Sequence, residues 1–318
     1  MNVDKVYIIN LDRNKDRFKN CSNMLNKLGG IFSNFERLPA VDGSKLDKDK
    51  IYNLLTISSL HSLYNYYHLD SDIRSVGAIG CYLSHYKIWK DIIKNNYQNV
   101  IVFEDDAYNV ANYDEINNFI TSLPEDFDIA FFNYHNYSNI KNSDDNLNEY
   151  NQFWCTSNDY SFFHTDSYII SNKGAAKLLE KALPISQQVD AYIHVIATLK
   201  PDFKRYFSKK KLFKQNSKFD TTIQDECFKC KINRYVDFLS ESEFKDLVSK
   251  MKIKENFYGD YYDEIHNFDE ETNFVNNKII ENFINEKLYG KTYLDTCFII
   301  KFVIVLVLLF LILKINNK

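Results

Sequence analysis

Residues that mark fibrous, low-complexity and disulfide-stapled proteins are scarce in this sequence. Its 318 residues include only 4 prolines, 8 glycines and 6 cysteines. So little proline and glycine excludes a collagen-like repeat or a disordered glycine-rich chain. Six scattered cysteines are too few for a disulfide framework in a chain of this length. A hydrophobic core must therefore hold the protein together.

An excess of positive charge is also missing. The net charge is −4 at pH 7, whereas a general nucleic-acid-binding protein normally carries a basic face. We therefore expect no nucleic-acid partner. Cys227 and Cys230 form the only C-x-x-C of the chain. Zinc is the minor interpretation of this pair, because a structural zinc site needs two more ligands nearby.

Apolar and aromatic residues are abundant by contrast. Hydrophobic residues make up 45% of the chain and aromatic residues 16%, including 25 Phe and 23 Tyr. This composition is typical of a globular protein. The length allows one large α/β domain with appendages or two ordinary domains.

The last part of the chain contains a long apolar segment. Residues 297–315 are interrupted only by Lys301 and Lys314. A buried core helix is the alternative interpretation, because the uninterrupted run at 302–313 is shorter than the roughly 20 residues that a bilayer needs. We favour a single-pass membrane anchor, since both lysines can extend their amines toward the interfaces.

The first residues, "MNVDKVYIINLDRNKDRF", do not resemble a secretory signal, because charged residues surround a four-residue apolar run. We therefore expect the large domain in the cytosol, attached to a membrane by the C-terminal segment. Lysines on both sides of that segment leave its orientation undecided by the positive-inside rule.

Strands and helices alternate between these ends, which predicts an α/β fold. The expected strands are 4–10, 32–41, 99–104 and 127–134, and the expected helices are 12–28, 75–96 and 113–122. Residues 159–185 follow as strand, turn and helix, with Ser171 or Asn172 as the N-cap. We divide the chain into an α/β domain at 1–235, a helical extension or stalk at 236–296 and the anchor at 297–315.

Three acids end one of the predicted strands, in "VIVFEDDA". Side chains alternate along a strand, so Glu104 and Asp106 should share one face, about 6 to 7 Å apart, while Asp105 points away. Ligands of open α/β sheets bind at the carboxyl ends of strands, and Mg²⁺ and Mn²⁺ prefer oxygen ligands. The acids therefore suggest a metal that holds a diphosphate, although an acidic helix cap is the alternative.

A series of short motifs carries a family resemblance. "VYIINLDRNKDRF", "RLPAVDG", "GAIGCYLSHYKIWKDI" and "VIVFEDDA" are followed by "TDSYIISNKGAAKLL", "PISQQVDAYI" and "QNSKFDTTIQ". In this order they closely resemble glycosyltransferase family 25, which contains lipopolysaccharide and collagen galactosyltransferases. The resemblance covers roughly residues 4–225.

The resemblance implies a GT-A fold, which is a Rossmann-like nucleotide-sugar domain, and an inverting transfer from a UDP-sugar with Mn²⁺ or Mg²⁺. Glu104 and Asp106 then match the metal-binding acids of that fold, with Glu104 shared between metal and ribose. Asp190 matches the acid of a downstream motif and is our candidate for the general base or for a residue that anchors the acceptor. A helix cap or a solvated acid is the alternative for Asp190.

Further residues are candidates for the donor site. Asn10, Asp12 and Arg13 follow the first strand, and Arg13 or Arg17 could meet the diphosphate. A surface salt bridge is the default for Arg17. Asp42 follows the second strand, where ribose or uridine contact is plausible. The complete set of expected donor-binding residues is Asn10, Asp12, Arg13, Asp42, Ser84, His85 and Asp105.

Several of these residues have structural alternatives. His85 is as consistent with a satisfied buried histidine as with a pocket residue, and Ser84 lacks the third group that a serine nucleophile needs. Asp105 is expected to hold a loop or cap the next helix. His194 could join a metal shell, but a core or surface histidine is the favoured interpretation. Gly77 and Gly80 allow close backbone approach or simply begin a helix.

Together these observations predict a hexosyltransferase that moves galactose or glucose from a UDP-sugar to a glycan, lipid or protein hydroxyl. The alternative is a catalytically inactive relative that binds a nucleotide-sugar or a partner at the membrane. A metal-dependent phosphohydrolase is a third possibility, but no further cluster of His and Asp supports it.

Overall fold

The computed structural model describes residues 1–46, 51, 53–56, 59–60, 72–133, 135–136, 147–157 and 162–219. The chain divides into two units, Met1–Ile253 and Lys254–Lys318, and the described residues all belong to the first. No helix among them is both long and apolar enough to span a bilayer. The expected stalk, the expected anchor at 297–315, and Cys227 and Cys230 lie outside the described residues.

An eight-stranded mixed sheet forms the centre of the described part, in the order β2-β1-β3-β10-β5-β11-β8-β7. Its strands are β1 (Lys5–Asn10), β2 (Phe35–Pro39), β3 (Asn99–Glu104), β5 (Ile129–Phe131), β7 (Asn148–Glu149), β8 (Trp154–Thr156), β10 (Ser167–Ser171) and β11 (Arg205–Ser208). Strands β2, β1 and β3 are mutually parallel. The carboxyl ends of these three strands therefore meet at one edge of the sheet.

The first three elements confirm the predicted strand, helix and strand. The buried run of β1 leads into α1 (Lys15–Leu28), which buries Cys21 and Leu25 and ends at Gly29. Gly29 has a φ of +75°, which glycine adopts without strain. The chain then passes through the short 3₁₀ helix η1 (Gly30–Ser33) and returns as β2.

The longest helix among the described residues, α4 (Val76–Asn95), also lies where the sequence predicts it. The Ser75 side chain caps its N-terminus by accepting a hydrogen bond from the amide of Ala78, and Asn96 in a left-handed conformation ends it. The helix leads directly into β3, whose middle residues are fully buried. A short 3₁₀ helix, η2 (Gly43–Lys45), packs against α4.

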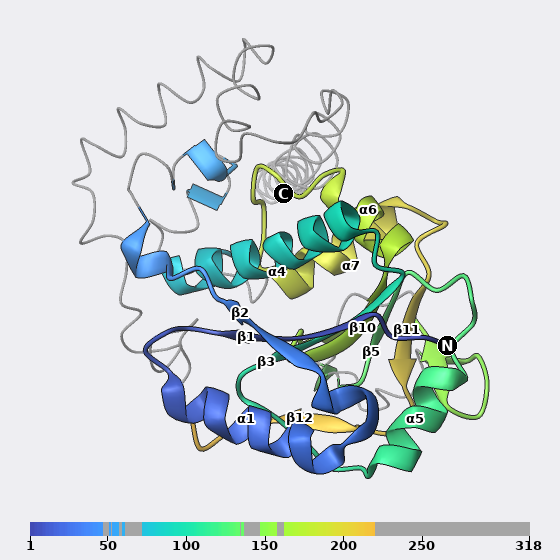
Figure 1. Cartoon of the computed structure of the whole chain (residues 1–318). Coiled ribbons are helices and arrows are strands. Elements are labelled where there is room, and N and C mark those ends of the chain that lie inside the picture. Colours follow the sequence, from blue (N-terminus) through green and yellow to red (C-terminus); the bar gives the residue numbers. More distant parts are fainter. Residues whose placement is uncertain are drawn as a thin grey trace, which may run out of the picture. The chain divides into compact units, whose positions relative to one another are not determined.

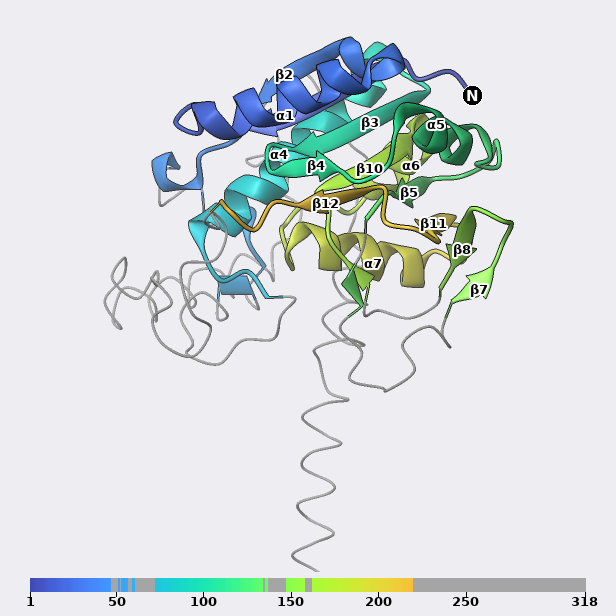
Figure 2. The ribbon, with the colours of Figure 1, turned by 90° about the horizontal axis from the view of Figure 1, so that it is seen from below.

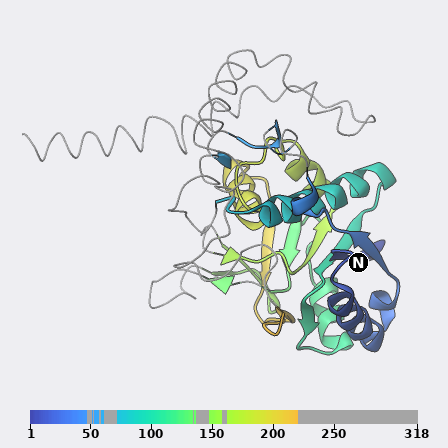
Figure 3. The ribbon, with the colours of Figure 1, turned by 90° about the vertical axis from the view of Figure 1, so that its left-hand side faces the viewer.

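Helices cover both faces of the sheet (Figures 1 and 3). Helices α4, α6 (Asn172–Leu179) and α7 (Val189–Leu199) lie on one face, and α1 and α5 (Tyr113–Thr121) lie on the other. Successive side chains of a strand point to opposite faces of the sheet, so each strand contributes to the core on both sides. Tyr7 of β1 reaches Asp91 of α4 at 2.5 Å, while Val6 and Ile8 join the core beneath α1. The predicted α/β class is confirmed.

The second half of the sheet contains β10, an antiparallel strand that places residues 164–166 beside the end of β3. Ser171 caps α6 through the amide of Gly174, as one of the two predicted caps. The preceding strand β10 runs antiparallel to β3, with Ser167 opposite Phe103. Residues just before β10 therefore lie beside Glu104, and the amide of Glu104 donates to the carbonyl of Asp166 at 2.9 Å.

Two small sheets complete the described part. Strand β12 (Phe213–Gln215) pairs antiparallel with β4 (Ala107–Asn109), which follows the three acids (Figure 2). Strands β6 (His135–Asn136) and β9 (Phe162–Phe163) form the other pair. The pairing of β12 brings residues 213–215 next to the acidic turn, by which we mean Glu104, Asp105 and Asp106.

Candidate active site

A pocket of about 220 Å³ opens where β1, β2 and β3 end. Its wall consists of the residues after β1, the loop after β2, the first turns of α4 and the end of β3. This is where open α/β sheets bind their ligands. Six predicted site residues line it: Asn10, Arg13, Asp42, Ser84, Glu104 and Asp105.

Close approach of α4 to the loop after β2 shapes one wall of the pocket. A Cβ atom at Gly80 would lie 2.4 Å from the carbonyl oxygen of Val41, and one at Gly43 would lie 1.7 Å from that of Val76. The Ser84 hydroxyl accepts from the amide of Val41 at 2.9 Å and donates to the carbonyl of Gly80 at 2.6 Å. Gly80 and Ser84 therefore bind the loop to the helix, and the Ser84 hydroxyl is occupied.

Asn10, at the end of β1, connects three segments. Its amide nitrogen donates to Asp105 at 2.6 Å and to the carbonyl of Asn14 at 2.9 Å. Its amide oxygen accepts from Arg37 of β2 at 2.8 Å. Asn10 is 2% exposed. This buried side chain holds the acidic turn against the ends of both neighbouring strands.

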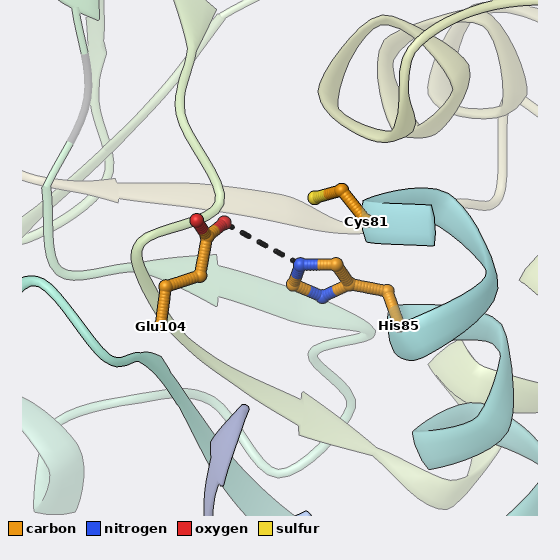
Figure 4. A group of neighbouring side chains, drawn as sticks. All are labelled: Cys81, His85 and Glu104. Carbon is orange, nitrogen blue, oxygen red and sulfur yellow. Dashed lines mark ion pairs between the residues drawn. The ribbon is translucent and has the colours of Figure 1, made fainter. Parts of the chain in front are cut away.

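Glu104 points toward α4, where Cys81 and His85 lie one turn apart (Figure 4). Its Oε1 is 3.4 Å from His85 Nε2 and accepts from the Thr165 hydroxyl at 2.8 Å. Burial favours the neutral acid, but the His85 ring and the Thr165 hydroxyl outweigh it and lower the pKa of Glu104. His85 is fully buried and its Nδ1 lies 2.9 Å from the Tyr168 hydroxyl.

Asp105 and Asp106 face Arg17 of α1 instead. Arg17 Nε lies 2.6 Å from Asp105, and Arg17 Nη2 lies 2.7 Å from Asp106. The expected alternation, with Glu104 and Asp106 on one face and Asp105 pointing away, is wrong. The strand ends at Glu104 and the chain turns at the next two residues, so the two-residue period of a strand no longer applies.

Arg17 also differs from its expected surface salt bridge, because its side chain is only 11% exposed. Its one positive charge faces two carboxylates, and Glu104 adds a third nearby. Desolvation and then the charge of Glu104 raise the pKa of Asp106 to about 7. Asp106 Oδ1 is buried without a hydrogen-bond partner among the described residues. A divalent cation bound at Glu104 and Asp106 would neutralise this excess, and the Oδ1 atom of Asp106 is one oxygen available to it.

Asp190 reaches the same region from the first turn of α7. Its carboxylate accepts from the amide of Ala191 at 2.7 Å and interacts with the backbone and ring of His164. Burial raises the pKa of the Asp190 carboxyl, against the effect of these neighbours. The charge of Glu104 adds to the increase, so Asp190 and Glu104 lie close enough to repel each other.

The remaining candidates do not contact the acidic turn in a way that supports a role in metal binding. Asp12 is exposed and pairs with Arg37, and Arg13 pairs with Asp42 at the rim of the pocket. Neither Asp12, His85, Asp106 nor Asp190 lines the pocket itself. His194 is a core histidine, as favoured above: it is buried beside Arg205 and stacked on Phe131 and Phe207.

Three residues of the site were missed in the sequence, namely Cys81, His164 and Thr165. His164 has a φ of +108°, which is unusual for a residue other than glycine. Its ring lies 3.5 Å from Asp166. Burial opposes the charged ring, but the bond to Asp166 and its charge raise the pKa of His164. In the sequence, only the polar run at 164–166 before the apolar strand could have indicated His164 and Thr165. It points to the site only when β10 is known to pair with β3.

Comparison with known proteins identifies the family of this chain. The model of glycosyltransferase family 25, described as a lipopolysaccharide biosynthesis protein family, matches residues 3–193. A glycosyltransferase 25 family member from Drosophila pseudoobscura pseudoobscura is 29% identical over 202 residues, covering 59% of this chain and 29% of the relative. Procollagen galactosyltransferase 2 from Homo sapiens is 29% identical over 223 residues, covering 67% of this chain and 33% of the relative.

A third relative, from Bos taurus, is named probable inactive glycosyltransferase 25 family member 3. It is 31% identical over 113 residues, covering 36% of this chain and 18% of the relative. The matched part of the chain thus spans about a third or less of these curated relatives. The family match extends over more than half of the chain and includes β1, α4, the acidic turn and Asp190. The chain belongs to glycosyltransferase family 25.

Proposed function

We propose that this protein transfers a hexose, galactose or glucose, from a UDP-sugar to a hydroxyl group, with inversion at the anomeric carbon and with Mn²⁺ or Mg²⁺. The single observation that supports this most strongly is the gathering of Glu104, Asp105 and Asp106 at the end of β3, where the first two line a pocket formed by the ends of three parallel strands. Family membership and the mixed sheet with helices on both faces agree with the proposed GT-A domain.

The donor would occupy the pocket between the end of β1 and the start of α4. The rim residues Arg13 and Asp42 and the backbone of the loop after β2 face that space, where polar groups suit a ribose and a nucleobase. Arg13 is about half exposed, so its guanidinium remains accessible to a diphosphate oxygen. Arg17 is occupied by two acids and has a positioning role instead.

Glu104 and Asp106 would hold the divalent cation, with Arg17 and Gln215 fixing Asp106 from the other side. The cation would stabilise the negative charge that develops on the departing diphosphate. Thr165 and His85 restrict the Glu104 carboxylate to one orientation. Such restriction supports catalysis, because a fixed ligand needs no rearrangement during the reaction.

Asp190 would accept the proton of the attacking hydroxyl. An inverting transfer needs one base on the acceptor side, and a carboxylate whose pKa is raised by burial is better suited to this role than a solvated one. His164 would hold the Asp190 carboxylate through its amide and its ring. The backbone strain at His164 supports a functional role for this turn.

The test is UDP release by the full-length protein with a panel of UDP-sugars and acceptors, with Mn²⁺ and with a chelator, and with product mass determined. We expect turnover that depends on the metal. Asp106→Asn and Glu104→Gln should each lower it at least about 100-fold, the scale of losing one electrostatic stabiliser. Asp190→Asn should lower kcat by about 10²- to 10⁴-fold, as expected for a general base.

Asp126→Asn is the matched control, because Asp126 pairs with Lys204 on the surface before β5, at the opposite edge of the sheet. Its activity should equal that of the parent. The proposal is wrong if no donor in the panel gives metal-dependent turnover.

The name of the bovine relative favours a second candidate, an inactive protein that retains nucleotide-sugar binding. In that case calorimetry should detect UDP-sugar binding without UDP release, and Asp190→Asn should change neither. The intact set of Glu104, Asp106 and Asp190 supports the enzyme. The acceptor we propose is a glycan, lipid or protein hydroxyl, reached by a cytosolic domain that residues 297–315 attach to a membrane.

A further inference from the structure

Three side chains of different chemistry meet beside the pocket: Cys81 of α4 and Glu104 at the end of β3 line it, and His85 of α4 lies behind them (Figure 4). One ligand atom from each lies within 4.8 Å of the others. Cys81 and His85 are four residues apart, so they project from the same face of the helix. Sulfur, nitrogen and oxygen ligands are thus already gathered around one point.

We propose that Cys81, His85 and Glu104 bind a thiophilic divalent cation, of which Zn²⁺ is the type. This site differs from the all-oxygen site proposed for Mn²⁺ or Mg²⁺, because a thiolate and an imidazole select zinc over those harder cations. It also does not depend on the transfer reaction. Glu104 belongs to both sites.

The separation of the ligand atoms fits zinc. In a tetrahedral site with Zn–N and Zn–O bonds of about 2.0–2.2 Å, the nitrogen and oxygen ligands lie about 3.3–3.5 Å apart. His85 Nε2 and Glu104 Oε1 are 3.4 Å apart. That separation is long for a hydrogen bond, and His85 Nε2 is buried without a hydrogen-bond partner in the described part of the chain. A buried polar atom of this kind needs an explanation, and a cation between Nε2 and Oε1 provides one.

The surrounding residues orient the ligands as in other zinc sites. Nδ1–H of His85 can donate to the Tyr168 hydroxyl at 2.9 Å, which leaves the lone pair on Nε2 for the metal. The Thr165 hydroxyl donates to Glu104. Such partners beyond the ligands fix the tautomer and the carboxylate orientation. Binding would release the Cys81 thiol proton to solvent.

The position of the site has a chemical consequence. Cys81 and Glu104 line the pocket while His85 lies behind them, so a cation held by all three would have its fourth position open toward the pocket. Three protein ligands and one open position are typical of zinc sites that bind a small molecule rather than of structural ones.

Cobalt(II) is the probe for the test, because cobalt bound to a thiolate absorbs in the near ultraviolet. The full-length protein should carry Cys227→Ser and Cys230→Ser, so that the C-x-x-C cannot contribute. We expect a charge-transfer band that saturates at one Co²⁺ per chain and that Zn²⁺ removes. Cys81→Ser should abolish the band, and Glu104→Gln should weaken Co²⁺ binding at least about 10-fold. Cys155→Ser, which removes a buried thiol on β8, should retain it.

A second measurement needs no variant of the site. In the same parent protein, Zn²⁺ should slow the alkylation of Cys81, followed by peptide mass analysis, whereas Mn²⁺ should not. Absence of the cobalt band together with unprotected Cys81 would overturn the proposal and leave His85 and Glu104 as a simple ion pair. Neither readout uses UDP-sugar turnover, so this result is independent of the transfer experiment.

Discussion

Arg17 is the residue on which the acidic turn depends. It projects from the first turn of α1 and contacts both Asp105 and Asp106, and all three side chains are largely buried. The ring of Phe219 lies beside the guanidinium, 5.6 Å from its carbon. Buried charges need a partner, because desolvation of an unpaired ion is costly. Arg17 therefore offsets part of the cost of burying two acids, whose pKa values are nevertheless raised by desolvation.

Removal of this charge should destabilise the fold. Arg17→Gln leaves two buried carboxylates uncompensated, so we expect a loss of about 3–5 kcal/mol in the free energy of unfolding. Adding Asp105→Asn should recover part of that loss, because one of the two carboxylates is gone. Arg13→Gln is the control: its ion pair with Asp42 is half exposed and should contribute at most about 1 kcal/mol. Urea denaturation measures all four proteins, and equal losses for Arg17→Gln and Arg13→Gln would contradict this account.

At the scale of elements, the contact between α4 and the loop after β2 decides the shape of the pocket. Gly43 and Gly80 permit backbone atoms to approach where a methyl group would not fit. Ser84 adds a hydrogen bond from the loop to the helix. Tyr7 of β1 donates a hydrogen bond to Asp91 of α4, and α4 also packs against α6 and α7. The wall of the pocket is therefore closely packed on the helix side.

A methyl group at Gly80 should separate these elements. Its Cβ would meet the Val41 carbonyl at 2.4 Å and the Gly43 nitrogen at 2.8 Å, both backbone atoms that cannot rotate away. We expect Gly80→Ala to lower the free energy of unfolding by about 1–3 kcal/mol and to weaken UDP binding in calorimetry. Lys87→Ala on the exposed side of α4 should stay within about 0.5 kcal/mol of the parent. Equal stability of the two variants would show that the loop does not press on the helix.

At the scale of the whole molecule, the match to family 25 falls within the first of the two units of the chain. Residues 254–318 form the second unit, which contains the predicted anchor. The proposed arrangement places the donor site on the first unit and membrane attachment on the second. The two functions are therefore expected to be separable by substitution.

Membrane association should depend on residues 297–315 alone. We expect the full chain to sediment with membranes and to resist extraction by high salt. Leu308→Arg combined with Leu309→Arg should release it, because each arginine near the centre of a span costs about 2.5–3.5 kcal/mol. Leu308→Ile combined with Leu309→Ile is the matched control and should remain with the membranes. Protease digestion of sealed membranes then tests the topology, since protection of the catalytic domain would contradict the cytosolic prediction.

Local patterns were sufficient for the first half of the described fold and for β5, β10 and α6, but they did not predict β7, β8, α7, β11 or β12. The apolar runs and helical spacing correctly predicted β1, α1, β2, α4, β3 and α5, and Ser171 was one of the two predicted caps of α6. Each of these signals operates over a few residues, through side-chain alternation or capping. The same rule failed at the acidic turn, because alternation ends where the strand ends. The local pattern does not show which residue that is.

The sequence alone determined the fold class, the family resemblance, the acids at the end of a strand and the apolar C-terminal segment. Only the tertiary structure decided how the acids are divided, with Glu104 toward Cys81 and His85, and Asp105 and Asp106 toward Arg17. The partners of these acids lie at least 19 residues away along the chain, and up to 109 for Gln215. Such contacts arise from strand order and helix packing, which no local pattern encodes.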